Sequence, residues 1–164
     1  NPTGTEDRFG TVSQTLSVPT SSDYTVSTIN PDVVSTTVIT FTNPGGGDFT
    51  PTVDSASRLT QTNGASGQIV SVDLINGKLV LIDVVGDFIA SNTITQGGVT
   101  ATLSTITTKS GIVIGWDSGT GSLKVKMTTE ELFAVGDIID DSNSGTSPVT
   151  QRTITAVEGS GGFV

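Results

Sequence analysis

The sequence predicts an all-β protein that has an N-terminal extended arm, a small β-hairpin module and two tandem related β modules of barrel-like or sandwich-like form. Composition is the first reason. Hydrophobic residues make up 34% of the chain and charged residues 14%, and Ser and Thr accompany 20 Gly, which suits short strands joined by tight turns. Helix-forming residues never gather in a 3.6-residue pattern over more than one turn, so almost no helix is expected.

An internal repeat is the second reason. Residues 67–94 and 111–139 align at one constant offset until a one-residue insertion shifts the last part. The aligned pairs are Gly67 with Gly111, Asp73 with Asp117, Gly77 with Gly121, Leu79 with Leu123, Phe88 with Phe133 and Ile94 with Ile139. Self-similarity at a fixed offset indicates one supersecondary unit used twice. We therefore expect a first β repeat at 67–110 and a second at 111–160.

Residues 1–34 are rich in Thr, Ser and Pro and show no sustained period. Prolines interrupt ladder hydrogen bonding, so any strand here is expected to be short or at an edge. Two interpretations are open: a partly disordered leader, or an arm that lies on a neighbouring subunit. In the second, the apolar residues would be the anchors: Phe9, Leu16, Val18 and Tyr24.

Residues 35–66 predict a hairpin module. The segment STTVITFTN alternates with period two, and Pro44 and three glycines then end it before DFTPTVD returns. The first repeat follows with strands at 69–73 and 78–85, joined through Asn76-Gly77, a dipeptide that favours a type I′ turn. A third strand is expected at 99–104.

The second repeat differs from the first on the outer face of one strand. Leu123, Val125 and Met127 should face the core, so Lys124 and Lys126 must point outward. The corresponding outward positions in the first repeat are Val80 and Ile82. Burying two such side chains is worth about 3 to 6 kcal/mol, so we expect an interface there, between modules or between subunits.

The C-terminal part contains one expected helical turn at 130–133 and a last strand at 152–157. Phe88 and Phe133 are predicted to be equivalent core residues. The tail 161–164 ends in Phe163 and Val164, which either fray or dock on a neighbour.

Several classes of function are excluded or disfavoured by composition. The chain has no Cys and no His, which removes disulfides, thiolate or imidazole metal sites and His-dependent nucleophiles. A net charge of −9 with 7 basic residues argues against binding to nucleic acid or to anionic membranes. No apolar run reaches the roughly 18 residues of a membrane span. The first residue is Asn1, which is consistent with processing or with an excerpt of a longer chain.

Two small constellations carry alternative chemistry. Asp137, Asp140 and Asp141 lie in a flexible-looking loop and are the best candidates for Ca²⁺, although a solvated turn is the preferred interpretation. Trp116 beside Asp117 is a candidate ligand platform for glycans, whereas a Trp at a strand end is more often a lid on the core. No pair of carboxylates is placed for glycoside hydrolysis. We expect no enzyme activity, no catalytic residue and no cofactor.

The repeat pattern G-x-V-x-x-W-D-x-x-x-G-x-L-x-V, followed by Phe, G-D-x-I and a Ser/Gly-rich loop, resembles repeats of large virion structural proteins of tailed cyanophages. ITFTNPGGGDFTPTV resembles a second repeat of those proteins. The resemblance covers about residues 36–157. The chain departs from it where Val72 replaces the Trp of the first copy and where Phe49 stands in place of Tyr.

The resemblance implies a non-enzymatic bacteriophage virion protein. The expected role is a capsid-surface decoration or cement subunit that binds major capsid or tail subunits and forms a homo-oligomer. A tail, baseplate or fibre component is the nearest alternative, and a glycan-binding or bacterial surface β module is another. Arms and apolar strand faces would make the contacts.

Overall fold

The structure is a computed structural model that describes residues 12–141 and 148–158, and these residues are all-β. The strands in chain order are β1 (Ser13–Ser17), β2 (Val33–Gly45), β3 (Leu59–Gln61), β4 (Ser66–Asp73), β5 (Lys78–Val85), β6 (Thr93–Gln96), β7 (Val99–Asp117), β8 (Ser122–Met127), β9 (Ile138–Asp140), β10 (Gln151–Thr153) and β11 (Ala156–Glu158). One short 3₁₀ helix, η3 (Ser55–Ser57), precedes β3. The described residues contain no α-helix, and 130–133, where one helical turn was expected, have no helical structure.

The chain divides into two compact units that are interleaved along the sequence. Unit 1 comprises the described residues in 12–35, 109–141 and 151–158, and unit 2 comprises 36–108 and 148–150. The division falls inside β2 and inside β7, so each of these long strands contributes one portion to each unit. This arrangement differs from the predicted series of modules that follow one another along the chain.

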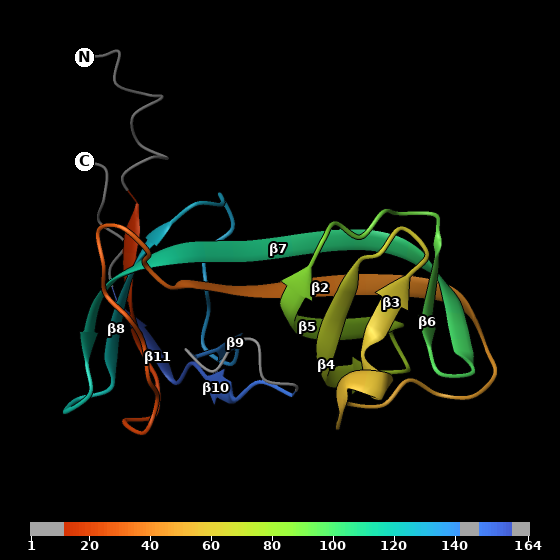
Figure 1. Ribbon diagram of the computed structural model, residues 1–164, viewed down its shortest axis with the longest axis horizontal. Coiled ribbons are helices and arrows are strands. Elements are labelled where there is room, and N and C mark those ends of the chain that lie inside the picture. Colours follow the sequence, from red (N-terminus) through yellow and green to blue (C-terminus); the bar gives the residue numbers. More distant parts are fainter. Residues whose placement is uncertain (1–11, 142–147, 159–164) are drawn as a thin grey trace, which may run out of the picture. The chain divides into compact units, whose positions relative to one another are not determined.

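Unit 2 is a closed ring of paired strands. Neighbouring strands follow the order β7, β2, β5, β4, β3 and β6, and β6 pairs again with β7, as Figure 1 shows for the strands around β4. Thr37 and Thr108, and also Thr40 and Thr105, contact each other through their hydroxyls across β2 and β7. Closure leaves no free strand edge in the ring, which protects it from edge-to-edge association.

Unit 1 is built from the order β11, β1, β8 and β7, together with a separate β9–β10 pair. Strand β8 shows why the sequence forms this structure. Leu123, Val125 and Met127 are buried and the two lysines between them are exposed, as the period of two requires. The buried side chains form one core with Phe133 and Ile139 from the connection to β9 and from β9.

The same hairpin occurs once in each unit, in the same register. In unit 2, Ile69 pairs with Leu81 and Ser71 pairs with Val80, with a bulge between them. In unit 1, the repeat counterparts of these residues pair in the same way, and the bulge lies between Val113 and Gly115. The two hairpins therefore share their irregularity as well as their alignment, which is typical of bulges in related structures.

The correspondence extends to residues that the sequence alignment did not include. Leu16 in β1 pairs with Leu123, and Ile39 in β2 pairs with Leu79, the counterpart of Leu123. After each pairing, the next hydrogen bond is also equivalent: the Val18 N–H donates to the Gly121 carbonyl, and the Phe41 N–H donates to the Gly77 carbonyl. β1 thus has the place in unit 1 that the middle of β2 has in unit 2.

This placement corrects the expectation of an arm for residues 12–34. Leu16 is fully buried, and Val18 and Tyr24 are 6% and 5% exposed, all within the core of unit 1. The sequence shows no sustained period here because β1 has only five residues. The side chains of β1 are buried by partners that are distant in sequence. Phe9, Phe163 and Val164 lie outside the described residues.

The turn at the tip of the first hairpin also differs from the prediction. Gly77 has positive φ, whereas Asn76 does not, so the turn is not type I′. The Asp73 carboxylate accepts hydrogen bonds from the Asn76 N–H and side-chain amide and thereby closes a longer turn. These bonds lower the pKa of Asp73, with the side-chain bond from Asn76 as the main cause.

Candidate functional site

Four of the five glutamines in the sequence are buried, and each binds both backbone polar groups of one residue distant in sequence; Gln96 donates to the Ser57 carbonyl as well. In every case the side-chain Nε2 donates to a carbonyl and the Oε1 accepts from the N–H of the same residue, at 2.7 to 3.1 Å. We call each arrangement a glutamine clamp. The clamped pairs are Gln14 with Phe133, Gln61 with Ile89, Gln68 with Val149 and Gln96 with Thr50.

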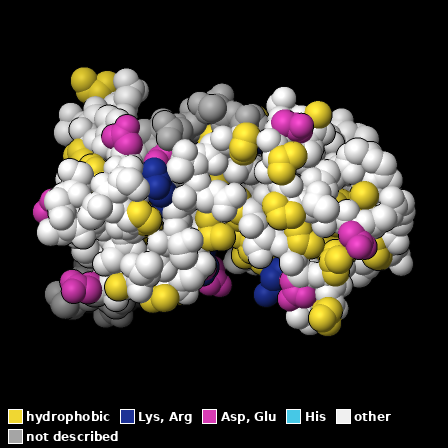
Figure 2. All heavy atoms as spheres, turned by 90° about the horizontal axis from the view of Figure 1, so that it is seen from below, with side chains coloured by type: hydrophobic (Ala, Val, Ile, Leu, Met, Phe, Trp, Pro, Cys, Tyr) yellow, Lys and Arg dark blue, Asp and Glu magenta, His cyan; other side chains and the backbone are white. Residues whose placement is uncertain are grey.

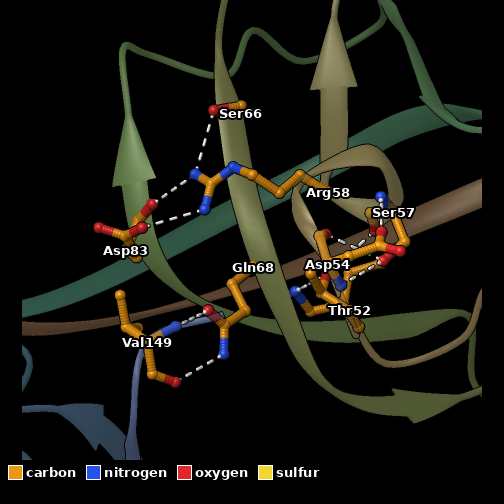
Figure 3. Close-up of polar contacts among 9 residues, drawn as sticks. Thr52, Asp54, Ser57, Arg58, Ser66, Gln68, Asp83 and Val149 are labelled. Atoms are coloured by element: carbon orange, nitrogen blue, oxygen red, sulfur yellow. Dashed lines mark hydrogen bonds and ion pairs between the residues drawn. The ribbon is translucent and has the colours of Figure 1, made fainter. Parts of the chain in front are cut away.

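The clamps explain how loops are held where strand pairing is missing. A carboxamide presents one donor and one acceptor, as a peptide group does, so it satisfies both polar groups of a buried residue. Gln68 on β4 holds Val149 by this means, as Figure 3 shows. The sequence alone did not reveal the clamps, because nothing in the spacing of the glutamines marks their backbone partners.

A second polar set fixes the loop before β3 in unit 2. Arg58 pairs with the Asp83 carboxylate at 3.0 Å and also donates to the Asp83 carbonyl and to Ser66, which Figure 3 shows. Asp54 and Ser57 form a reciprocal capping box around η3. These bonds join neighbouring strands and a loop, so their role in the fold is structural.

The predicted interface pair on β5 lies in different surroundings from those expected. Ile82 is fully buried, and Val80 is half-buried. Ile82 is the register partner of Gln68, so its side chain lies on the same face as the clamp that holds Val149. The chain itself therefore covers this face at Ile82, and a partner is not needed to bury that residue.

The equivalent face in unit 1 is open. A groove of about 500 Å³ lies between the loop 26–31 and strands β7 and β8, and it is lined on the strand side by Ile112, Ile114 and Lys126. Ile112 and Lys126 are the repeat counterparts of Gln68 and Ile82. Ile112 is half-buried and Lys126 is exposed, whereas both counterparts are fully buried.

Hydrophobic side chains are exposed on unit 2. Figure 2 shows them gathered over the face of unit 2 that it presents, with acidic side chains beside them. The most exposed are Ile75 (95%), at the tip of the β4–β5 hairpin, and Val53 (72%), before η3. Sequence reasoning missed Leu74 and Ile75. The signal was present in the repeat, because LI at this tip aligns with SG in the other copy.

The predicted ligand platform is part of the core. Trp116 is partly buried and packs edge to face on Tyr24, with ring centroids 5.0 Å apart. The Asp117 carboxylate accepts a hydrogen bond from the Gly119 N–H within the turn. Packing of Trp116 against the core favours its interpretation as a lid on the core over that of a platform for a sugar.

Tyr24 lies in a buried polar environment. Its hydroxyl has no hydrogen-bond partner within the described part of the chain. Burial raises its pKa, and the carboxylates of Asp141 and Asp140 raise it further. Asp141 forms an ion pair with Arg152 at 2.9 Å, and its side chain is fully buried.

Two of the three acidic residues considered for Ca²⁺, Asp137 and Asp141, form ion pairs with cations of the chain, and the third, Asp140, is buried in β9. Asp137 pairs with Lys109 at 2.8 Å and caps the Ala134 N–H, and Asp141 pairs with Arg152. Within 12–141 and 148–158, no group of three or more acidic side chains could hold a metal ion. In the same ranges, no helix is long and apolar enough to cross a membrane.

Comparisons of the chain with protein-family models, with curated proteins and with solved structures found no match.

Proposed function

We propose that this chain is a structural, non-enzymatic subunit of a bacteriophage virion that decorates or cements the capsid surface. The observation that carries an assembly role is the exposed apolar surface of unit 2, where Ile75 is 95% and Val53 72% exposed. Side chains exposed to this degree add nothing to the core of the chain, and exposed apolar surface is typical of contacts with other proteins.

The rigidity of the two units also supports the proposal. Closed strand pairing in unit 2 and buried glutamine clamps in both units give bodies that can present a fixed surface to neighbours. The resemblance of the repeats to cyanophage virion proteins is the reason for proposing a phage particle as the location. The partners would be major capsid subunits and further copies of the chain, and the location would be the virion.

The test is to look for the protein in particles of the phage that encodes it. Gradient-purified particles would be analysed by mass spectrometry, and an antibody against the purified protein would be located on them by immunogold electron microscopy. We expect the protein in the particles and the label on the heads. Label confined to tails, baseplates or fibres would replace the capsid role with a tail role, and absence from particles would contradict the proposal.

A further inference from the structure

The two hairpins of the repeat differ at their tips although their strands are equivalent. In unit 2 the tip is Leu74-Ile75, which is 47% and 95% exposed. In unit 1 the equivalent tip is Ser118-Gly119. Because both turns close with a glycine of positive φ and both begin with an Asp that accepts backbone N–H groups, the turn itself does not require Leu and Ile. The apolar pair is therefore a surface feature of unit 2.

The outer faces of the same hairpins also differ: the face in unit 2 is covered, and the equivalent face in unit 1 is open. In unit 2 the face that contains Gln68 and Ile82 holds an extended segment of the chain, and Val149 is 3% exposed there. In unit 1 the equivalent face is the open groove with Ile112 and Lys126 on its strand side. The filled face shows what kind of occupant this surface takes: a stretch of chain that Gln68 holds through the backbone of a buried aliphatic residue.

We propose that the Leu74-Ile75 tip of one copy docks in the unit 1 groove of a second copy. The tip supplies aliphatic side chains to a groove whose lining is itself partly aliphatic, with Val26, Ile112 and Ile114 among the lining residues. Charge favours the same pairing, because Asp73 adjoins the tip while Lys124 and Lys126 lie on the outer face of β8. In a chain of net charge −9, a lysine-bearing face is the part that a second copy approaches with the least repulsion.

The contact joins two different surfaces, so it is heterologous. Each chain then offers one apolar tip and one open groove, and repeated docking gives rings where the rotation closes and filaments where it does not. The inference rests on the proposed function only in treating the exposed tip as an assembly contact, and it names the partner of that tip as the same chain.

The first experiment uses the absence of cysteine from the sequence. An Ile75→Cys chain and a tagged Ile114→Cys chain would be mixed and treated with a short bismaleimide, which alkylates one thiol at each end. We expect a cross-linked species that contains one chain of each kind, with a yield at least about five times that of a Ser118→Cys chain mixed with the same Ile114→Cys chain. Equal yields from the two mixtures would overturn the proposal.

A second arm tests docking within one chain. The double variant Ile75→Cys with Ile114→Cys would be cross-linked at high dilution. We expect little intramolecular product, visible as a monomer of changed mobility. A dominant intramolecular product at low concentration would mean that the tip occupies the groove of its own chain, and the second copy would be excluded as the partner.

A third measurement uses light scattering over a dilution series, without cross-linking. For the unchanged chain we expect the molar mass to rise with concentration. The double variant Leu74→Ser with Ile75→Gly gives the unit 2 tip the residues of the unit 1 tip, and we expect it to abolish this rise. Val53→Ser removes a comparable exposed aliphatic side chain elsewhere on unit 2 and should leave the rise unchanged. An equal loss with both variants would show unspecific association and contradict the proposal.

Self-docking without presence in virions would reject only the virion role, and presence in virions without self-docking would reject only this inference.

Discussion

Replacing Gln14 by Met tests whether the glutamine clamps stabilise the fold. Gln14 is 3% exposed, and its carboxamide makes two 3.0 Å hydrogen bonds with the backbone of Phe133. Met has a similar volume and shape, so the substitution removes the hydrogen bonds without opening a large cavity. It leaves a buried N–H and a buried carbonyl without partners, at about 1 to 3 kcal/mol each. Allowing for the gain from burying an apolar side chain, we expect a loss of about 2 to 5 kcal/mol.

The assay is urea unfolding followed by the fluorescence of the single Trp116, which packs against the same unit 1 core. Gln151→Met is the matched control, because Gln151 is the one glutamine that is exposed, and we expect it to change the free energy of unfolding by less than about 0.5 kcal/mol. If Gln14→Met were as mild as Gln151→Met, the clamp would not hold the Phe133 loop, and the argument from buried polar groups would be refuted.

Three further predictions follow from buried or strained positions. Tyr24 is the single tyrosine, and its pKa is raised in the folded protein, so its contribution to stability is complete below pH 10 and falls as the pH rises above 10. Absorbance at 295 nm should therefore show no tyrosinate before the protein unfolds. A normal tyrosine titration in the folded protein would contradict this prediction. Gly121→Ala places a Cβ against the Val18 carbonyl at positive φ, so it should cost more than about 2 kcal/mol in thermal unfolding, whereas Gly45→Ala, with open space around it, should be nearly neutral. Arg152→Met removes the ion pair of the buried Asp141 carboxylate and should cost about 3 to 5 kcal/mol in urea unfolding. Adding Asp141→Asn to this variant should recover part of the loss, and no recovery would contradict the prediction.

The strand content and the repeat could be predicted because they depend on local pattern. Alternation around Leu123 and Val125 specifies which face of β8 is buried, and the aligned glycines mark equivalent turns. The all-β class follows from the same residues. These signals arise within a few residues of one another, so no knowledge of distant partners is needed.

The interleaving of the two units could not be predicted, because it depends on partners far apart in sequence. β1 is a short segment with two buried residues, Gln14 and Leu16, and its burial is supplied by β8 and by Phe133. In β2 the burial alternation changes phase at Thr36 and Thr37, next to the boundary between the units, and in β7 a run of exposed residues at 104–108 precedes the boundary. The sequence alone does not show which core lies on either side of these irregularities, because the residues that complete each core are distant.

The candidate site could be predicted only in part, from a comparison of the two copies of the repeat. Comparing the outward positions of the two copies correctly singled out a difference, since Lys126 and Ile82 have opposite character. The difference was attributed to an interface between modules or between subunits. Ile82 is fully buried by the chain itself, and the groove lined by Lys126 is the face left open. Equivalent positions in two copies share the demands of the same fold, so a difference between them reflects what each surface contacts. Whether the contact is internal or external is decided by distant segments such as the one that contains Val149, and the tip at Ile75 remains the position for which the described chain supplies no cover.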